Sequence, residues 1–238
     1  IDVDNGSVFT VTNASTVNMS GADDFRINVN DNSVVASSFI TGGNMTITRT
    51  DGDDIEFYAR EDGSVVTIGG DLLITSSGGE EITFGAFNDS DININGDLTI
   101  TESGADDIEI FITGAGRIDI DDNFLLTHTG DDDFELDIAN GATGTFNVDG
   151  SFTITDNNGG DEMLIDLNDG SMFVGASMNL NVLGAGTTQD IDLELDADAS
   201  LTVIGNMNVS LTGGDDIEMD MGDNSAGSTA SILCAGTI

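Results

Sequence analysis

The chain has 238 residues, of which 45 are acidic and only four are basic arginines, and its formal net charge at pH 7 is −41. Binding to nucleic acid or to an anionic membrane requires a basic surface, so this charge excludes both partners and favours cations or basic proteins. Hydrophobic residues make up 38% of the chain and alternate with polar ones along its length, which excludes a disordered acidic tail.

Apolar residues recur at a regular interval along the chain, each after a pair of mostly acidic residues. Successive members are 26 to 30 residues apart: Phe25, Ile55, Ile82, Ile108, Phe134, Met163, Ile191 and Ile217. A unit of about 27 residues that occurs about eight times is typical of a repeat protein, whose end units are often incomplete.

Each unit contains three short segments in which apolar and polar residues alternate, so we expect three strands per unit, each with one buried face. Examples of the first segment, with three inward residues, are 108–112, 134–138, 191–195 and 217–221. Examples of the second, with two, are 92–94, 118–120, 146–148 and 201–203. The third segments, also with two, are 45–47, 72–74, 98–100, 124–126, 152–154, 178–180 and 207–209.

These patterns predict an all-β fold, a parallel β-solenoid (β-helix) with three strands per coil and about eight coils, which forms a single domain over residues 1–238. Glycine, Asn, Asp and Ser fill the junctions, and the chain has no proline, as expected for many strands joined by tight turns. A β-sandwich of regular hairpins is the alternative. It does not explain why insertions fall mainly in the junctions while all three strand patterns persist.

Stacked coils would place equivalent carboxylates about 5 Å apart. The acidic pairs that precede the first segments form one such column, and outward residues such as Glu135, Asp137, Asp192 and Glu194 form an acidic stripe beside it. At that distance like charges repel by about 1 kcal/mol in water and by about 3 kcal/mol at an effective dielectric constant of about 20. Summed over the columns, this repulsion rivals the net stability of a domain, so something must offset it.

Three explanations remain open: bound Ca²⁺, a diffuse atmosphere of monovalent cations in salty surroundings, and carboxyl groups with raised pKa values. Calcium fits because carboxylate and carbonyl oxygens are its preferred ligands. The candidate calcium ligands are Asp53, Asp54, Asp106, Asp107, Asp132, Asp133, Asp161, Glu162, Asp215 and Asp216. The stretches "SGADDIEI" and "TGGDDIEM" resemble the glycine-aspartate turns of the RTX calcium-binding β-rolls. RTX units repeat about every nine residues, so their site geometry does not carry over.

Parallel β-helices also include polysaccharide lyases and polygalacturonases, so catalysis must be considered. Lyases commonly use an Arg or Lys on the outer wall, whereas this chain has no lysine and few arginines: Arg26, Arg49, Arg60 and Arg117. Such an acidic outer wall would also repel a polyanionic substrate. We expect His128 to be a turn residue and the protein not to be an enzyme.

The third segments contain "TIT" at residues 46–48, 99–101 and 153–155, with two outward threonines around an inward isoleucine. Stacked rows of this kind resemble insect ice-binding solenoids. Threonine is also a common strand residue, and other residues interrupt the row at Leu73, Leu125, Asn179 and Asn208. We therefore expect that no flat threonine face survives.

Several features bear on location. No run of about 18 apolar residues exists, so no membrane insertion is expected. The chain starts at "IDVDNG", inside a strand-like pattern, which indicates a processed form or a fragment of a longer protein. Cys234 is the only cysteine, so no internal disulfide can form, and we expect it to be a small buried side chain.

In its three-strand repeat and acid-glycine turns, the chain resembles the repetitive β-solenoid regions of large secreted bacterial adhesins and surface fibre proteins. The resemblance implies an extracellular or cell-surface location and a structural or adhesive role. We expect a subunit of a fibre or matrix with cations along its acidic faces. The alternatives are a non-polymerising adhesin stalk module and, third, a carbohydrate-active β-helix enzyme.

We also expect end-to-end assembly into a homo-oligomer or filament, since no capping helix is visible at either end and head-to-tail contacts that do not close build filaments. Arg26, Arg49 and Arg60 lie toward the N-terminal coils, and the densest acidic residues lie toward the C-terminal ones. That polarity favours head-to-tail contacts.

Overall fold

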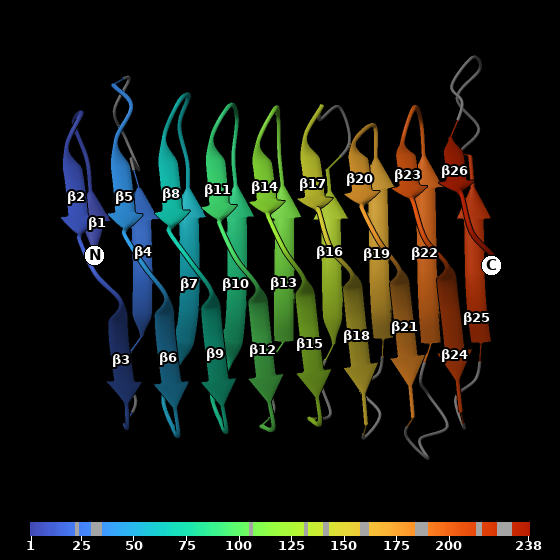
Figure 1. Cartoon of the computed structure of the whole chain (residues 1–238), viewed down its shortest axis with the longest axis horizontal. Coiled ribbons are helices and arrows are strands. Elements are labelled where there is room, and N and C mark those ends of the chain that lie inside the picture. Colours follow the sequence, from blue (N-terminus) through green and yellow to red (C-terminus); the bar gives the residue numbers. More distant parts are fainter. Residues whose placement is uncertain are drawn as a thin grey trace.

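A computed structural model describes residues 1–21, 24–29, 35–104, 107–130, 133–139, 143–157, 162–183, 190–212, 216–222 and 230–238. The described strands form three parallel sheets, and the chain visits the sheets in turn before it starts the next coil (Figure 1). The predicted parallel β-solenoid, with three strands in each coil of about 27 residues and about eight coils, is confirmed.

The strands of each sheet follow one another along the solenoid. The first sheet contains β1 (Asp2–Val3), β4 (Phe25–Val29), β7 (Asp54–Ala59), β10 (Glu81–Ala86), β13 (Asp107–Ile112), β16 (Phe134–Ile138), β19 (Glu162–Asn168), β22 (Asp190–Asp196) and β25 (Asp216–Met221). The second contains β2 (Val8–Val11), β5 (Ser38–Thr41), β8 (Val65–Ile68), β11 (Asp91–Ile94), β14 (Arg117–Ile120), β17 (Thr145–Val148), β20 (Ser171–Val174), β23 (Ser200–Val203) and β26 (Ser231–Cys234). The third contains β3 (Ser15–Met19), β6 (Met45–Arg49), β9 (Leu72–Ser76), β12 (Leu98–Glu102), β15 (Phe124–His128), β18 (Phe152–Asp156), β21 (Met178–Val182) and β24 (Met207–Leu211).

The register between coils follows the sequence repeat. Ile82 pairs with Ile55 on one side and Ile108 on the other, and Ile108 pairs in turn with Phe134. Because side chains alternate across a strand, this register places apolar residues in inward columns and polar residues in outward ones. One coil cannot bury its inward face alone, so the stacking of neighbours stabilises the fold.

The core is a continuous column of aliphatic side chains with stacked phenylalanines. Phe57 and Phe84 stack in parallel with ring centroids 5.0 Å apart, and Phe124 and Phe152 do so at 4.7 Å.

Cys234 packs against the core but is only half-buried, because it lies in the last strand of the second sheet. The expectation that it is a buried side chain is therefore wrong. Among the residues that the structure describes, there is no apolar helix with the length of a membrane span. The chain termini lie toward opposite ends of the long axis (Figure 1).

Candidate functional site

The acidic pairs lie at the start of the first-sheet strands. Of the candidate calcium ligands, the structure describes Asp53, Asp54, Asp107, Asp133, Glu162 and Asp216. Outside the described residues lie Asp106, Asp132, Asp161 and Asp215. Glu81 pairs with Asp54 on one side and with Asp107 on the other. The structure thus aligns the second residue of each acidic pair, such as Asp54, Glu81 and Asp107, in one column. We name it the acidic column.

Carboxylates of the acidic column accept hydrogen bonds from the backbone of the next coil. Asp107 Oδ1 accepts one from the N–H of Asp133 at 3.3 Å, and Asp133 Oδ1 accepts one from the N–H of Glu162 at 2.8 Å. Asp190 Oδ1 accepts a third from the N–H of Asp216 at 3.1 Å. Hydrogen bonds to ionised acceptors are stronger than those between neutral groups, so these side chains tie adjacent coils together.

Within the described part of the chain, one group of carboxylates is compact enough to hold a metal ion. One oxygen atom each of Asp24, Asp54 and Glu56 lies within 4.8 Å of the others. Asp24 is exposed, Asp54 is half-buried and Glu56 is buried. Arg26 donates a hydrogen bond to Glu56, so one positive charge already lies beside this group. Only Asp54 belongs to the calcium ligands that the sequence indicated.

The acidic stripe on the outer face of the first sheet contains carboxyl groups with raised pKa values. Burial, and then the charges of Glu81 and Glu135, raises the pKa of Glu109 to about 7. Burial, and then the charge of Asp137, raises the pKa of Asp166 to about 6. Burial first, and the charges of neighbouring carboxylates second, thus shift these groups toward the neutral form, as the protonation hypothesis expects.

A buried polar column lies at the ends of the third-sheet strands. Its members are Arg49, Ser76, Glu102, His128 and Asp156. His128 is the last residue of β15 and only 3% exposed, so its interpretation as a turn residue is wrong. Its Nε2 lies 2.9 Å from Glu102 Oε2, and its Nδ1 lies 3.9 Å from Asp156 Oδ1. The third segment of this coil was expected to span residues 124–126, but its alternation of inward and outward side chains continues for two more residues, to His128.

Arg49 belongs to the same buried column. Its guanidinium donates to Ser76 Oγ from two nitrogens, at 2.9 and 3.0 Å, and to the carbonyl of Glu81 at 3.3 Å. Because this side chain is wholly buried, Arg49 cannot provide the surface charge that we expected to favour head-to-tail contacts.

The outer face of the third sheet carries two columns of side chains. The first column is interrupted as expected, since it reads Thr46, Leu73, Thr99, Leu125 and Thr153. The second column is continuous over five coils: Thr48, Thr75, Thr101, Thr127 and Thr155. The face two threonines wide is therefore broken, as expected, but a single threonine row persists in the second column, because the interruptions fall on the other outward position of each strand.

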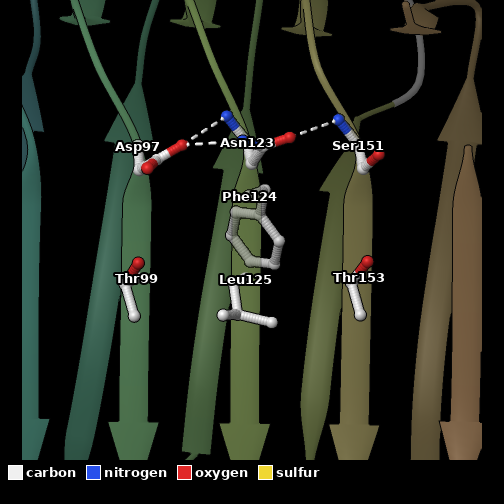
Figure 2. A pocket seen from close by; sticks show the side chains of 7 residues that line it. All are labelled: Asp97, Thr99, Asn123, Phe124, Leu125, Ser151 and Thr153. Carbon is white, nitrogen blue, oxygen red and sulfur yellow. Dashed lines mark hydrogen bonds between the residues drawn. The ribbon is translucent and has the colours of Figure 1, made fainter. Parts of the chain in front are cut away.

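A shallow groove of about 260 Å³ lies on the same face (Figure 2). Its floor and sides are Asp97, Thr99, Asn123, Phe124, Leu125, Ser151 and Thr153. Figure 2 shows the hydrogen bonds along one side of it. Asp97 Oδ1 accepts from the backbone and side-chain N–H groups of Asn123, both at 2.9 Å, and Asn123 Oδ1 accepts from the N–H of Ser151 at 2.9 Å. These hydrogen bonds engage polar groups along that side of the groove.

In comparisons with known proteins, no protein-family model, curated protein or solved structure matches the chain.

Proposed function

We propose that this chain is a structural building block of an extracellular or cell-surface fibre or matrix, without enzymatic activity. It binds divalent cations, calcium first, on its carboxylates, and it stacks end to end with further copies. The observation that carries the proposal is the register of the coils, which continues to the last strands.

The inward residues of the last first-sheet strand are exposed. Ile217, Met219 and Met221 are 45%, 41% and 46% exposed, whereas their partners one coil earlier, Ile191, Leu193 and Leu195, are at most 2% exposed. Full burial of a large aliphatic side chain contributes about 1.5–3 kcal/mol. A further coil stacked on this strand would bury these residues and pair the open strand edges, and in the proposed fibre the first coil of another subunit supplies it.

Charge opposes such stacking, because each subunit carries a net charge of −41. Calcium bound between carboxylates would offset this repulsion, since it takes several oxygen ligands. The group Asp24, Asp54 and Glu56 supports this part of the proposal, and it lies in the N-terminal coils near one of the two ends.

Negative-stain electron microscopy of the purified chain, in EDTA and in millimolar Ca²⁺, tests the proposal. We expect fibres only with Ca²⁺. The double variant Asp54→Asn/Glu56→Gln should require more Ca²⁺, whereas Asp121→Asn/Asp122→Asn, which removes two exposed charges in the middle of the solenoid, should assemble normally. Single short rods in both conditions would contradict assembly and support a non-polymerising adhesin stalk module.

The uninterrupted threonine column favours a second candidate function, ice binding. It repeats hydroxyl and methyl groups at the strand spacing of about 4.8 Å, which would order water in regular rows. The test is thermal hysteresis of the wild type and of Thr101→Tyr, with Thr202→Tyr on the second sheet as the control. Hysteresis that only Thr101→Tyr abolishes supports this function, and its absence from the wild type contradicts it.

A further inference from the structure

Aromatic side chains gather on the outer face of the first sheet. Tyr58 of β7, Phe111 of β13 and Phe87, which follows β10, contact one another, with ring centroids 5.1 to 6.3 Å apart. Gly85 lies in register between Tyr58 and Phe111. A Cβ atom at Gly85 would approach ring atoms of both Tyr58 and Phe87 to 2.8 Å, so the absent side chain makes room for the rings. We name Tyr58, Phe87 and Phe111 the aromatic patch.

One side of the aromatic patch already holds a cation. The guanidinium carbon of Arg60 lies 4.2 Å from the centre of the Tyr58 ring and 5.0 Å from that of Phe87. Arg60 Nε also donates to Asn28 Oδ1 at 3.0 Å, which fixes the guanidinium in place. Cations are attracted to aromatic faces at such distances, so the contact with Arg60 shows that the aromatic patch can bind a basic side chain.

The other side of the patch, at Phe111, borders a groove of about 270 Å³. Its walls are Glu109, Ile110, Phe111, Glu135 and Asp137. Glu109 pairs with Glu135 and Phe111 pairs with Asp137 across β13 and β16, so three carboxylates and one ring line the same groove. An apolar wall beside several carboxylates suits an aliphatic stem that ends in a positive charge.

The chain itself has no cation for this groove. It contains no lysine, and all four arginines are described and engaged elsewhere. Arg26 binds Glu56, Arg117 binds Asp119, Arg49 is buried and Arg60 lies over Tyr58 and Phe87. A second copy of the chain is therefore a poor occupant, whereas a net charge of −41 attracts basic proteins over a long range.

We propose that the groove beside Phe111 is a docking site for a basic side chain, lysine or arginine, presented by an extended segment of a partner protein. The stem packs against Phe111, and the positive charge lies among Glu109, Glu135 and Asp137. This site is independent of the fibre proposal, because it uses the outer face of the middle coils and not the ends.

The test is calorimetric titration with an acetylated and amidated peptide of alternating lysine and threonine, at physiological salt. We expect Phe111→Thr to weaken binding about fivefold, because a cation–π contact is lost. Phe173→Thr, which removes a half-exposed ring on the second sheet, is the control and should bind like the wild type. Circular dichroism verifies that both variants fold.

Two further results separate this site from general attraction to an acidic surface. Glu135→Gln should weaken peptide binding more than Glu218→Gln, which removes the same charge in the last first-sheet strand. Equal affinities of the wild type and Phe111→Thr, or equal losses in Phe111→Thr and Phe173→Thr, overturn the proposal. If Glu135→Gln abolishes Ca²⁺ binding and leaves peptide binding unchanged, the groove is an ion site and the proposal is wrong.

Discussion

Three titratable residues of the buried polar column, Glu102, His128 and Asp156, end three successive third-sheet strands. An isolated buried charge is unfavourable by several kcal/mol, so Glu102, His128 and Asp156 depend on one another. Gly130 is part of this arrangement. A Cβ atom there would lie 2.8 Å from His128 Nε2 and 2.9 Å from Glu102 Oε2, so a glycine is required where the chain passes the pair.

At this residue scale, we predict that His128→Leu lowers the free energy of unfolding by about 3–5 kcal/mol, because two buried carboxylates lose their shared partner. Urea denaturation followed by circular dichroism measures the change. An effect below about 1 kcal/mol would show that the imidazole does not hold the two carboxylates.

The matched control replaces the whole group. Asp156 pairs with Val182 in the next coil, and Val182 pairs with Leu211, so the same column is aliphatic further along the solenoid. The triple variant Glu102→Leu/His128→Leu/Asp156→Val should therefore recover most of the stability lost in His128→Leu. If the triple variant is no more stable than His128→Leu, then lost packing, and not unpaired charge, causes the loss of stability.

At the element scale, polar side chains connect successive turns between the second and third sheets. Asn44 Nδ2 donates to Asp71 Oδ2 at 2.8 Å, and the N–H of Asp97 donates to Asp71 Oδ1 at 3.2 Å. Asp97, Asn123 and Ser151 continue the series. Strands of parallel sheets depend on their connections for register, and these side chains fix each turn against the one before it.

We predict that Asn123→Ala lowers the free energy of unfolding by about 1–2 kcal/mol, because it removes a bond to Asp97 and leaves the N–H of Ser151 without its acceptor. Asn95→Ala, at an exposed position of the preceding turn, is the control and should change stability by less than about 0.5 kcal/mol. Thermal melting of both variants provides the comparison. If both lose the same stability, the loss reflects the preference of asparagine for turns and not the hydrogen bonds of Asn123.

At the scale of the whole molecule, the outer face of the first sheet determines the response to pH. The pKa of Glu109 rises from 4.5 to about 7, and that of Asp166 rises from 3.8 to about 6. Between the ordinary and the raised pKa values, the folded chain binds more protons than the unfolded chain. Stability from these groups is therefore complete below their ordinary pKa values and is lost as the pH rises through the raised ones.

We accordingly predict a higher melting temperature near pH 5 than near pH 8 at low salt. The difference should shrink in Glu109→Gln/Asp166→Asn, since these amides do not titrate, and should persist in the exposed pair Glu80→Gln/Asp89→Asn. Scanning calorimetry at both pH values measures it. A higher melting temperature at the alkaline pH would show that the raised pKa values of Glu109 and Asp166 do not control the pH dependence of stability.

The strands, most of their inward positions and their register can be predicted from the amino-acid sequence alone. Period-two alternation fixes which residues of a strand are buried, and a repeat of about 27 residues fixes which residues stack, as the pairing of Ile82 with Ile55 and Ile108 shows. The acidic column followed from the same two rules, because Asp54, Glu81 and Asp107 occupy one position of the repeat.

The contacts of individual polar and aromatic side chains, in contrast, depend on how the coils pack in three dimensions. Arg49, Glu102 and His128 continue the inward alternation, but charged residues are rarely buried, so burial became evident only when their partners in neighbouring coils were in place. Phe87 lies in a junction, where no alternation predicts a direction, and its contacts with Tyr58 and Phe111 depend on the path of three coils. Such contacts depend on the distance between side chains of different coils, which the spacing of residues along one chain does not specify.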